Sequence, residues 1–190
     1  MIDIHIDSCA WNVLLEFGVD LGSEFPTDSF RLWIPREIEM ELAAIPSAKA
    51  ELLTFIRDAV ARCGVKVDVW FGFCDTDTQP EARKVGGFGE GRWVSKQEWE
   101  FVDANRRLIG SGDRPKTHLK KNEADLALAA RSLSAVVLTA DVKPAGPLAA
   151  ARSMGGNVLD IRAYRAFPGS FRDFVITAAP VPGEGGSGPP

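Results

Sequence analysis

The chain is poor in the residues that build zinc sites and disulfide frameworks. It has two histidines and three cysteines, Cys9, Cys63 and Cys74, with no CxxC pair. An odd number of cysteines without paired spacing, together with the lack of an N-terminal signal-peptide pattern, predicts a protein of the reducing cytoplasm. Cys9 is close to an acidic motif, but no histidine follows it closely, so we expect a small packed thiol rather than a nucleophile.

Long hydrophobic runs and an excess of positive charge are also lacking. No apolar stretch approaches the length of a membrane span, so we expect no membrane partner. The net charge of -4 gives no general attraction to nucleic acid, and a nucleic-acid substrate would need a local basic patch together with bound metal. With 45% hydrophobic residues in a length of 190, the chain suits one compact domain.

What the chain does contain is a regular succession of short apolar segments and amphipathic segments. The pattern predicts strands over 2–6, 30–34, 65–71, 135–140 and 158–161, and helices over 10–19, 36–44, 47–64, 95–108, 122–133 and 147–154. Strands that alternate with helices are joined by crossovers, which implies parallel pairing. We therefore expect an α/β fold, a three-layer α/β/α arrangement with a central, mostly parallel five-stranded sheet.

Two segments break this rhythm. Residues 72–94 are rich in glycine and poor in apolar residues, which predicts a long loop inserted in a single domain over 1–175. Their GGFGEG motif has no GK[ST] after it, so a phosphate-binding loop is not expected there. Residues 176–190 end in GEGGSGPP and are expected to form a flexible tail.

Four acidic residues lie at or beside the predicted strand ends. Asp7 ends the first apolar run and Asp141 ends a later one, whereas Glu41 and Asp125 lie in helical segments beside the sheet. The carboxyl ends of parallel strands meet at one crevice, so these side chains are expected to converge. Each acid taken alone is explained equally well by a helix cap or a solvated position, and the ordered set is what favours a shared site.

Four carboxylates in one crevice repel each other unless a cation holds them. Hard divalent cations prefer oxygen ligands, and no His or Cys cluster accompanies these acids, so Mg²⁺ or Mn²⁺ is the expected ion. Such an ion lowers the pKa of a bound water and stabilises charge on phosphate oxygens. The pattern therefore indicates metal-dependent hydrolysis of a phosphodiester, with Asn12 or Asn122 orienting water.

At these residues the chain resembles the PIN-domain family of metal-dependent ribonucleases. Its motifs IHIDSCAWN, IPREIEMEL, NEADLALAARS and VVLTAD are similar, in this order, to the four acidic motifs of the family, over about Met1 to Ala163. The resemblance implies a set of functional residues: Asp7, Glu41, Asp125 and Asp141 as catalytic metal-binding acids, Glu123 as a further metal-binding acid, and Ser8 as a substrate-binding hydroxyl. Glu37 and Glu39 are near-register alternatives to Glu41.

Two features depart from the family pattern. Val142, Lys143 and Pro144 follow Asp141, where many members carry another acid, and this argues against a second metal ion. Segment 72–94 is longer than in compact toxin-type members, so the RNA that is selected is expected to differ from theirs. The resemblance further implies a homodimer and, for a toxin-type member, an antitoxin protein as candidate partners.

A basic stretch precedes the third acidic motif and is expected at the rim of the crevice. There it would hold the phosphates of an RNA substrate on either side of the cut. Its members are Arg106, Arg107, Arg114, Lys116, Lys120 and Lys121. Trp93 and Trp99 are candidates for base stacking, although large aromatic side chains are more often packed in a core.

The acids and the resemblance together favour a Mg²⁺- or Mn²⁺-dependent endoribonuclease of the cytoplasm, of the toxin or the RNA-processing type. The expected products carry a 3′-hydroxyl and a 5′-phosphate. The main alternative is a catalytically inactive PIN-like module that binds nucleic acid or protein. A third class is a phosphotransferase with Asp7 as nucleophile, but Asp7-Ser8-Cys9 does not match the DxDx[TV] motif of haloacid-dehalogenase-like enzymes.

Overall fold

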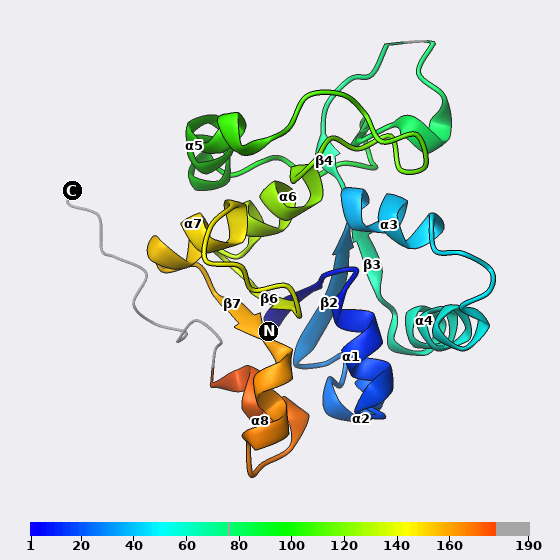
Figure 1. Cartoon of the computed structure of the whole chain (residues 1–190), viewed down its shortest axis with the longest axis vertical. Helices are drawn as coiled ribbons and strands as arrows, with labels where there is room; N and C mark the ends of the chain where they lie inside the picture. The colour runs from blue at the N-terminus through cyan, green and yellow to red at the C-terminus, as the bar shows by residue number, and fades with distance from the viewer. Residues whose placement is uncertain (76, 178–190) are drawn as a thin grey trace.

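Five parallel strands form the main sheet, in the order β3-β2-β1-β6-β7 (Figure 1). The computed structural model describes residues 1–75 and 77–177. The strands are β1 (Ile2–Ile6), β2 (Phe30–Pro35), β3 (Lys66–Asp68), β6 (Val136–Thr139) and β7 (Val158–Asp160). Each pairing between neighbours in this sheet is parallel. The expected five-stranded parallel sheet is therefore confirmed.

Helices cover both faces of this sheet. In Figure 1, α5, α6 and α7 lie on one side of the sheet, and α1, α2, α4 and α8 lie on the other, which confirms the three-layer α/β/α arrangement. The helices are α1 (Ala10–Glu16), α2 (Leu21–Glu24), α3 (Arg36–Ala43), α4 (Ala50–Cys63), α5 (Lys96–Asn105), α6 (Glu123–Arg131), α7 (Pro147–Ser153) and α8 (Phe171–Ile176), with 3-10 turns η1 (Pro80–Ala82), η2 (Arg106–Leu108) and η3 (Ile161–Ala166). None of the helices within the described ranges is long and apolar enough to cross a membrane.

Local sequence signals account for some of the element ends. Ser95 and Glu98 form the expected capping box, which starts α5, and Gly64 adopts a left-handed conformation that ends α4. Ser47 does not start α4, which begins at Ala50 without a side-chain cap. The flexible tail expected over 176–190 lies almost entirely outside the described residues, and Ile176 belongs to α8 rather than to a tail.

The single strand expected over 65–71 is in fact divided at Val69. Its first part is β3, whereas Trp70 and Phe71 form β4, which pairs with β5 (Val85–Gly86) in a separate two-stranded sheet. The expected loop over 72–94 therefore contains a strand and the turn η1. Gly91 lies so close to Phe71 that a Cβ atom there would sit 2.6 Å from the Phe71 Cα, which explains a glycine at this position.

A buried carboxylate at the end of β3 explains why the strand divides. Asp68 accepts hydrogen bonds from Arg131 Nε at 2.5 Å and from Arg92 Nε at 2.8 Å, and its Oδ2 lies 3.1 Å from His5 Nε2. Burial acts to raise the pKa of Asp68, but the hydrogen bond with His5 and the cations of Arg131 and Arg92 outweigh it and hold the pKa well below its usual range. The Trp70 ring lies over the Arg131 guanidinium, 4.3 Å from ring centroid to Cζ.

Replacing this carboxylate should destabilise the protein strongly. Asp68→Ala leaves Arg131 buried without its counter-charge, so we expect a loss of about 3–5 kcal/mol in the free energy of unfolding, measured by urea denaturation at pH 7. The matched control is Glu16→Ala, which removes an exposed ion pair with Arg165 and should change stability by about 0.5 kcal/mol or less. Equal losses in the two variants would contradict this account of the buried pair.

Candidate active site

The candidate site lies where the order of the strands changes direction. From β1 the sheet continues through β2 on one side, and from β6 it continues through β7 on the other. Such a switch point leaves a crevice outside the carboxyl ends of the strands, where α/β proteins bind ligands. Asp7 directly follows β1, its backbone N–H donates to the Leu138 carbonyl of β6 at 2.9 Å, and Asp141 lies two residues beyond the end of β6.

All four acids predicted from the sequence line one cavity at this place, with a volume of about 220 Å³. Asp7 and Asp141 reach it from the ends of β1 and β6, Glu41 from α3, and Asp125 from the first turn of α6. The other lining residues are Ser8, Cys9, Arg114, Lys120, Lys121, Asn122, Ala124 and Lys143. Four segments that are far apart in the sequence thus bring a carboxylate to the same cavity.

Asp7 is the most firmly held of these acids. It is 4% exposed, and its Oδ2 accepts hydrogen bonds from Thr139 Oγ1 at 2.6 Å and from Cys9 Sγ at 2.9 Å. Ser8 donates to Glu41 Oε2 at 2.5 Å and lies 3.4 Å from Asp7 Oδ1, so one hydroxyl connects two of the carboxylates. Sequence reasoning did not single out Thr139, although strand alternation places it on the same side as Asp141, two residues later.

The negative charges of neighbouring acids raise the pKa of two of the four carboxyl groups. Burial raises the pKa of Glu41; the hydrogen bond from Ser8 opposes this rise, and the charges of Asp7 and Asp125 add to it. Burial likewise raises the pKa of Asp125, and the charges of Asp7 and Asp141 raise it further. The cavity is therefore a place where negative charge accumulates and a cation is favoured.

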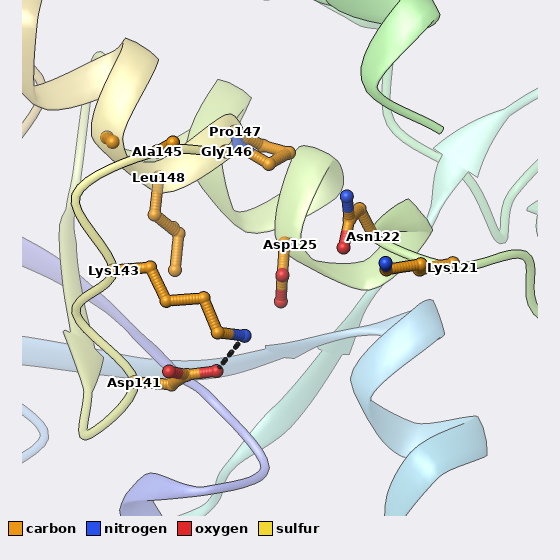
Figure 2. A pocket seen from close by; sticks show the side chains of 10 residues that line it. Lys121, Asn122, Asp125, Asp141, Lys143, Ala145, Gly146, Pro147 and Leu148 are labelled. Carbon is orange, nitrogen blue, oxygen red and sulfur yellow. Dashed lines mark ion pairs between the residues drawn. The ribbon is translucent and has the colours of Figure 1, made fainter. Parts of the chain in front are cut away.

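Two cationic side chains of the protein already approach these acids. Lys143 Nζ lies 2.5 Å from Asp141 Oδ2, and Arg114 Nη1 lies 4.0 Å from Glu41 Oε1. Figure 2 shows Lys143 extended toward Asp141 from one side while Asp125 points into the same space from α6. A second cavity of about 330 Å³, lined also by Pro147 and Leu148, shares both of these acids and Lys143 with the first.

The donor types in the cavity suit a hard divalent cation, because the carboxylates offer only oxygen. The side-chain positions do not yet suit one. Across residues 1–75 and 77–177, no three His, Cys, Asp or Glu side chains lie close enough together to hold a metal ion. To bind an ion, the carboxylates would have to move closer together and Lys143 would have to leave Asp141.

Other predicted acids have different partners. The Glu123 carboxylate pairs with Lys84 Nζ at 2.9 and 3.0 Å and accepts the Lys120 backbone N–H at 2.7 Å, and it does not line the cavity. Of the near-register alternatives to Glu41, Glu37 is buried and Glu39 pairs with Arg36. Neither of them lines the cavity, so Glu41 is the acid of α3 that reaches it.

The predicted substrate-binding residues divide into two groups. Lys120, Lys121 and Ser8 line the cavity, whereas Arg106 and Arg107 belong to η2 and do not. The two asparagines expected to orient water divide in the same way, because Asn12 on α1 does not line the cavity and Asn122 does. The Asn122 side chain, however, donates to the Leu108 carbonyl at 2.9 Å, which ties the start of α6 to η2.

Cys9 is not suited to act as a nucleophile. Burial raises the pKa of its thiol to about 12, and the charge of Asp7 contributes to the rise. The thiolate is the reactive form of cysteine, so at neutral pH this side chain remains protonated. Its role in the geometry is to donate a hydrogen bond to Asp7.

The raised pKa of Asp125 predicts pH-dependent stability in metal-free protein. The pKa of this carboxyl group is higher in the folded chain than in the unfolded chain, where it is near 4. Such a group contributes stability at pH values below its pKa in the unfolded chain. That stability is lost as the pH rises through its pKa in the folded chain. Asp125→Asn removes this loss, so in chelator the variant should be more stable than wild type at pH 8 and match it below pH 4.

Urea denaturation at the two pH values measures this difference. The matched control is Asp58→Asn, which makes the same charge change at an exposed position of α4 and should leave the pH dependence of wild type unaltered. If Asp125→Asn is less stable than wild type at pH 8, the carboxylates around the cavity do not repel one another as described.

The family resemblance rests on the four acidic motifs alone. No protein-family model matches the chain, and neither the curated proteins nor the solved structures give a significant match. The functional argument therefore depends on the residues around the cavity.

Proposed function

We propose that the protein is a Mg²⁺- or Mn²⁺-dependent endoribonuclease that hydrolyses phosphodiester bonds of RNA. One observation carries the proposal: four acidic side chains from separate segments line a single cavity at the strand-order switch point. Their order along the chain is that of the acidic motifs of PIN-domain ribonucleases, which the sequence resembles. The oxygen donors of the four carboxylates and the accumulated negative charge support a divalent cation as cofactor.

In this proposal Asp7, Glu41, Asp125 and Asp141 hold the ion. A bound divalent ion of this kind lowers the pKa of water and neutralises charge on phosphate oxygens. Asp7 supplies the fixed point, because Thr139 and Cys9 hold one of its oxygens. Arg114, Lys120 and Lys121, which line the same cavity, are placed to bind the phosphates of the RNA strand.

The biological setting follows from the resemblance and belongs to the same proposal. It comprises a role in the cytoplasm as the toxin of a toxin–antitoxin pair or as an RNA-processing enzyme, with an antitoxin protein and a second copy of the chain as candidate partners. The products would carry a 3′-hydroxyl and a 5′-phosphate.

A second candidate function is a catalytically inactive PIN-like module that binds nucleic acid or protein. One observation favours it: Lys143 and Arg114 already approach two of the four acids, so the protein itself supplies part of the balancing positive charge. Calorimetric titration with Mn²⁺ separates the two candidates. Heat of binding at millimolar Mn²⁺ or below supports the nuclease. If no heat of binding is detected at millimolar Mn²⁺, the result favours the inactive module.

Asp7→Asn should abolish cleavage while leaving the fold intact. The amide keeps an oxygen for the Thr139 hydrogen bond but loses the negative charge that a metal ligand needs, so the cleavage rate should fall by more than about a hundredfold. The measurement uses end-labelled RNA with Mn²⁺, with added chelator as a second means of stopping the reaction.

Asp58→Asn serves as the control for cleavage, because Asp58 lies on the exposed face of α4. This variant should cut RNA at the wild-type rate. A thermal melt of each variant separates loss of chemistry from loss of fold. Wild-type cleavage by Asp7→Asn would refute the assignment of the site.

A further inference from the structure

A lysine of the protein lies among the acids of the candidate site. Lys143 Nζ is 2.5 Å from Asp141 Oδ2. Arg114, a second cation near these acids, is more distant, at 4.0 Å from Glu41 Oε1. The hydrogen bond with Asp141 raises the pKa of Lys143, and the charges of Asp141 and Asp125 add to the rise. The ammonium group therefore neutralises a carboxylate that a metal ion would need.

The backbone around Lys143 is held in place, but its side chain is not buried. The Asp141 N–H donates to Thr139 Oγ1 at 3.1 Å, and the Lys143 carbonyl accepts a hydrogen bond from Arg152 Nη2 of α7 at 3.0 Å. The side chains of Lys143 and Asp141 are 61% and 46% exposed, and an ion pair so exposed to water is weak. Lys143 can therefore exchange Asp141 for another anion by rotation of its side chain, without movement of the backbone.

A cavity beside Asp141 has room for such an anion. This cavity, of about 330 Å³, is lined by both Lys143 and Lys121. Figure 2 shows the two lysines on opposite sides of Asp125. Lys121 is exposed and takes part in none of the ion pairs within the described ranges. A phosphate group in this cavity would meet two ammonium groups, and only one of them has a competing carboxylate.

This cavity adjoins the one that the four acids line. The two cavities share Lys121, Lys143, Asp125 and Asp141. A strand with one phosphate among the carboxylates therefore has a neighbouring phosphate in reach of the lysines. A phosphate attracts the Lys143 ammonium as a point charge, in direct competition with Asp141.

We propose that Lys143 exchanges Asp141 for a phosphate of the RNA substrate, so that substrate binding frees this carboxylate for the divalent ion. The inference rests on the proposed nuclease function and adds a regulation of its site, because without substrate the protein's own lysine occupies Asp141. Linkage is reciprocal, so RNA should raise the affinity for the ion and the ion should raise the affinity for RNA. Lys143 stands where many PIN-domain proteins carry an acid, which makes the exchange a feature of this chain.

Calorimetric titration with Mn²⁺ in the absence of RNA tests the first half of the exchange. Lys143→Met keeps the length of the side chain and removes its charge, so the variant should bind Mn²⁺ about tenfold more tightly than wild type. Lys49→Met is the matched control, because Lys49 is exposed before α4 and lines neither cavity. It makes the same change of net charge and should bind Mn²⁺ as wild type does. Equal affinities of Lys143→Met and wild type overturn the proposal.

Fluorescence anisotropy with a labelled oligo(U) of about twelve nucleotides tests the second half, in chelator so that no strand is cut. Lys143→Met should weaken binding about threefold and lower the slope of log affinity against log salt by about one, because a phosphate contact is lost. Lys49→Met should leave both values unchanged. If Lys143→Met tightens Mn²⁺ binding but leaves RNA affinity and salt slope at the wild-type values, the lysine is a fixed counter-ion and the exchange is overturned.

A double-mutant cycle measures the exchange itself. In chelator, Asp141→Asn releases Lys143 for the phosphate, so it should tighten RNA binding in the wild-type background more than in Lys143→Met. An equal effect in both backgrounds overturns the proposal, because Asp141 then acts on RNA independently of the lysine. All of these side chains are partly exposed, and a thermal melt of each variant checks that the fold is retained.

A cleavage assay with Mn²⁺ separates this inference from the proposed function. Cleavage of RNA together with equal Mn²⁺ and RNA affinities in wild type and Lys143→Met overturns the exchange and leaves the nuclease standing. The expected shifts in both affinities without any cleavage support the exchange and overturn the nuclease. Absence of Mn²⁺ binding in every variant at millimolar ion overturns both.

Discussion

The buried ion pair between Asp68 and Arg131 is the interaction on which the arrangement of the site depends. Arg131 lies at the end of α6, and its bond to Asp68 fixes that helix to β3 of the main sheet. The same carboxylate holds Arg92 of the insert, which pairs in turn with Glu98 on α5. One side chain therefore joins the sheet, the helix that carries Asp125, and the inserted segment 72–94.

Much of the fold follows from patterns that are local in the sequence. The apolar runs predicted the five strands of the main sheet because side-chain alternation and run length are set within a few residues. The division of 65–71 could not be predicted in this way, because it depends on a partner 63 residues from Asp68. The pairing of β4 with β5 is missed for the same reason, since thirteen residues, 72–84, separate the two strands.

The candidate site shows the same limit. The topology of a parallel sheet was sufficient to bring Asp7, Glu41, Asp125 and Asp141 to one cavity. Whether a nearby acid lines the cavity depends on its side-chain partners, which the spacing of residues in the sequence does not reveal. Glu123 lies two residues from Asp125 but pairs with Lys84 of the insert, and Lys143 folds back on Asp141. A motif thus predicts the backbone position of an acidic residue, whereas the contacts of its side chain determine the direction in which the carboxylate points.

The hydrogen bonds to Asp7 have a consequence for how freely its carboxylate can turn. Thr139 and Cys9 both donate to Oδ2, which leaves Oδ1 as the oxygen with no donor nearer than the Ser8 hydroxyl at 3.4 Å. Two donors on one oxygen restrict rotation of the carboxylate about its own axis. The position of Oδ1 is therefore set by Thr139 and Cys9, that is, by the fold, and not by what the cavity holds.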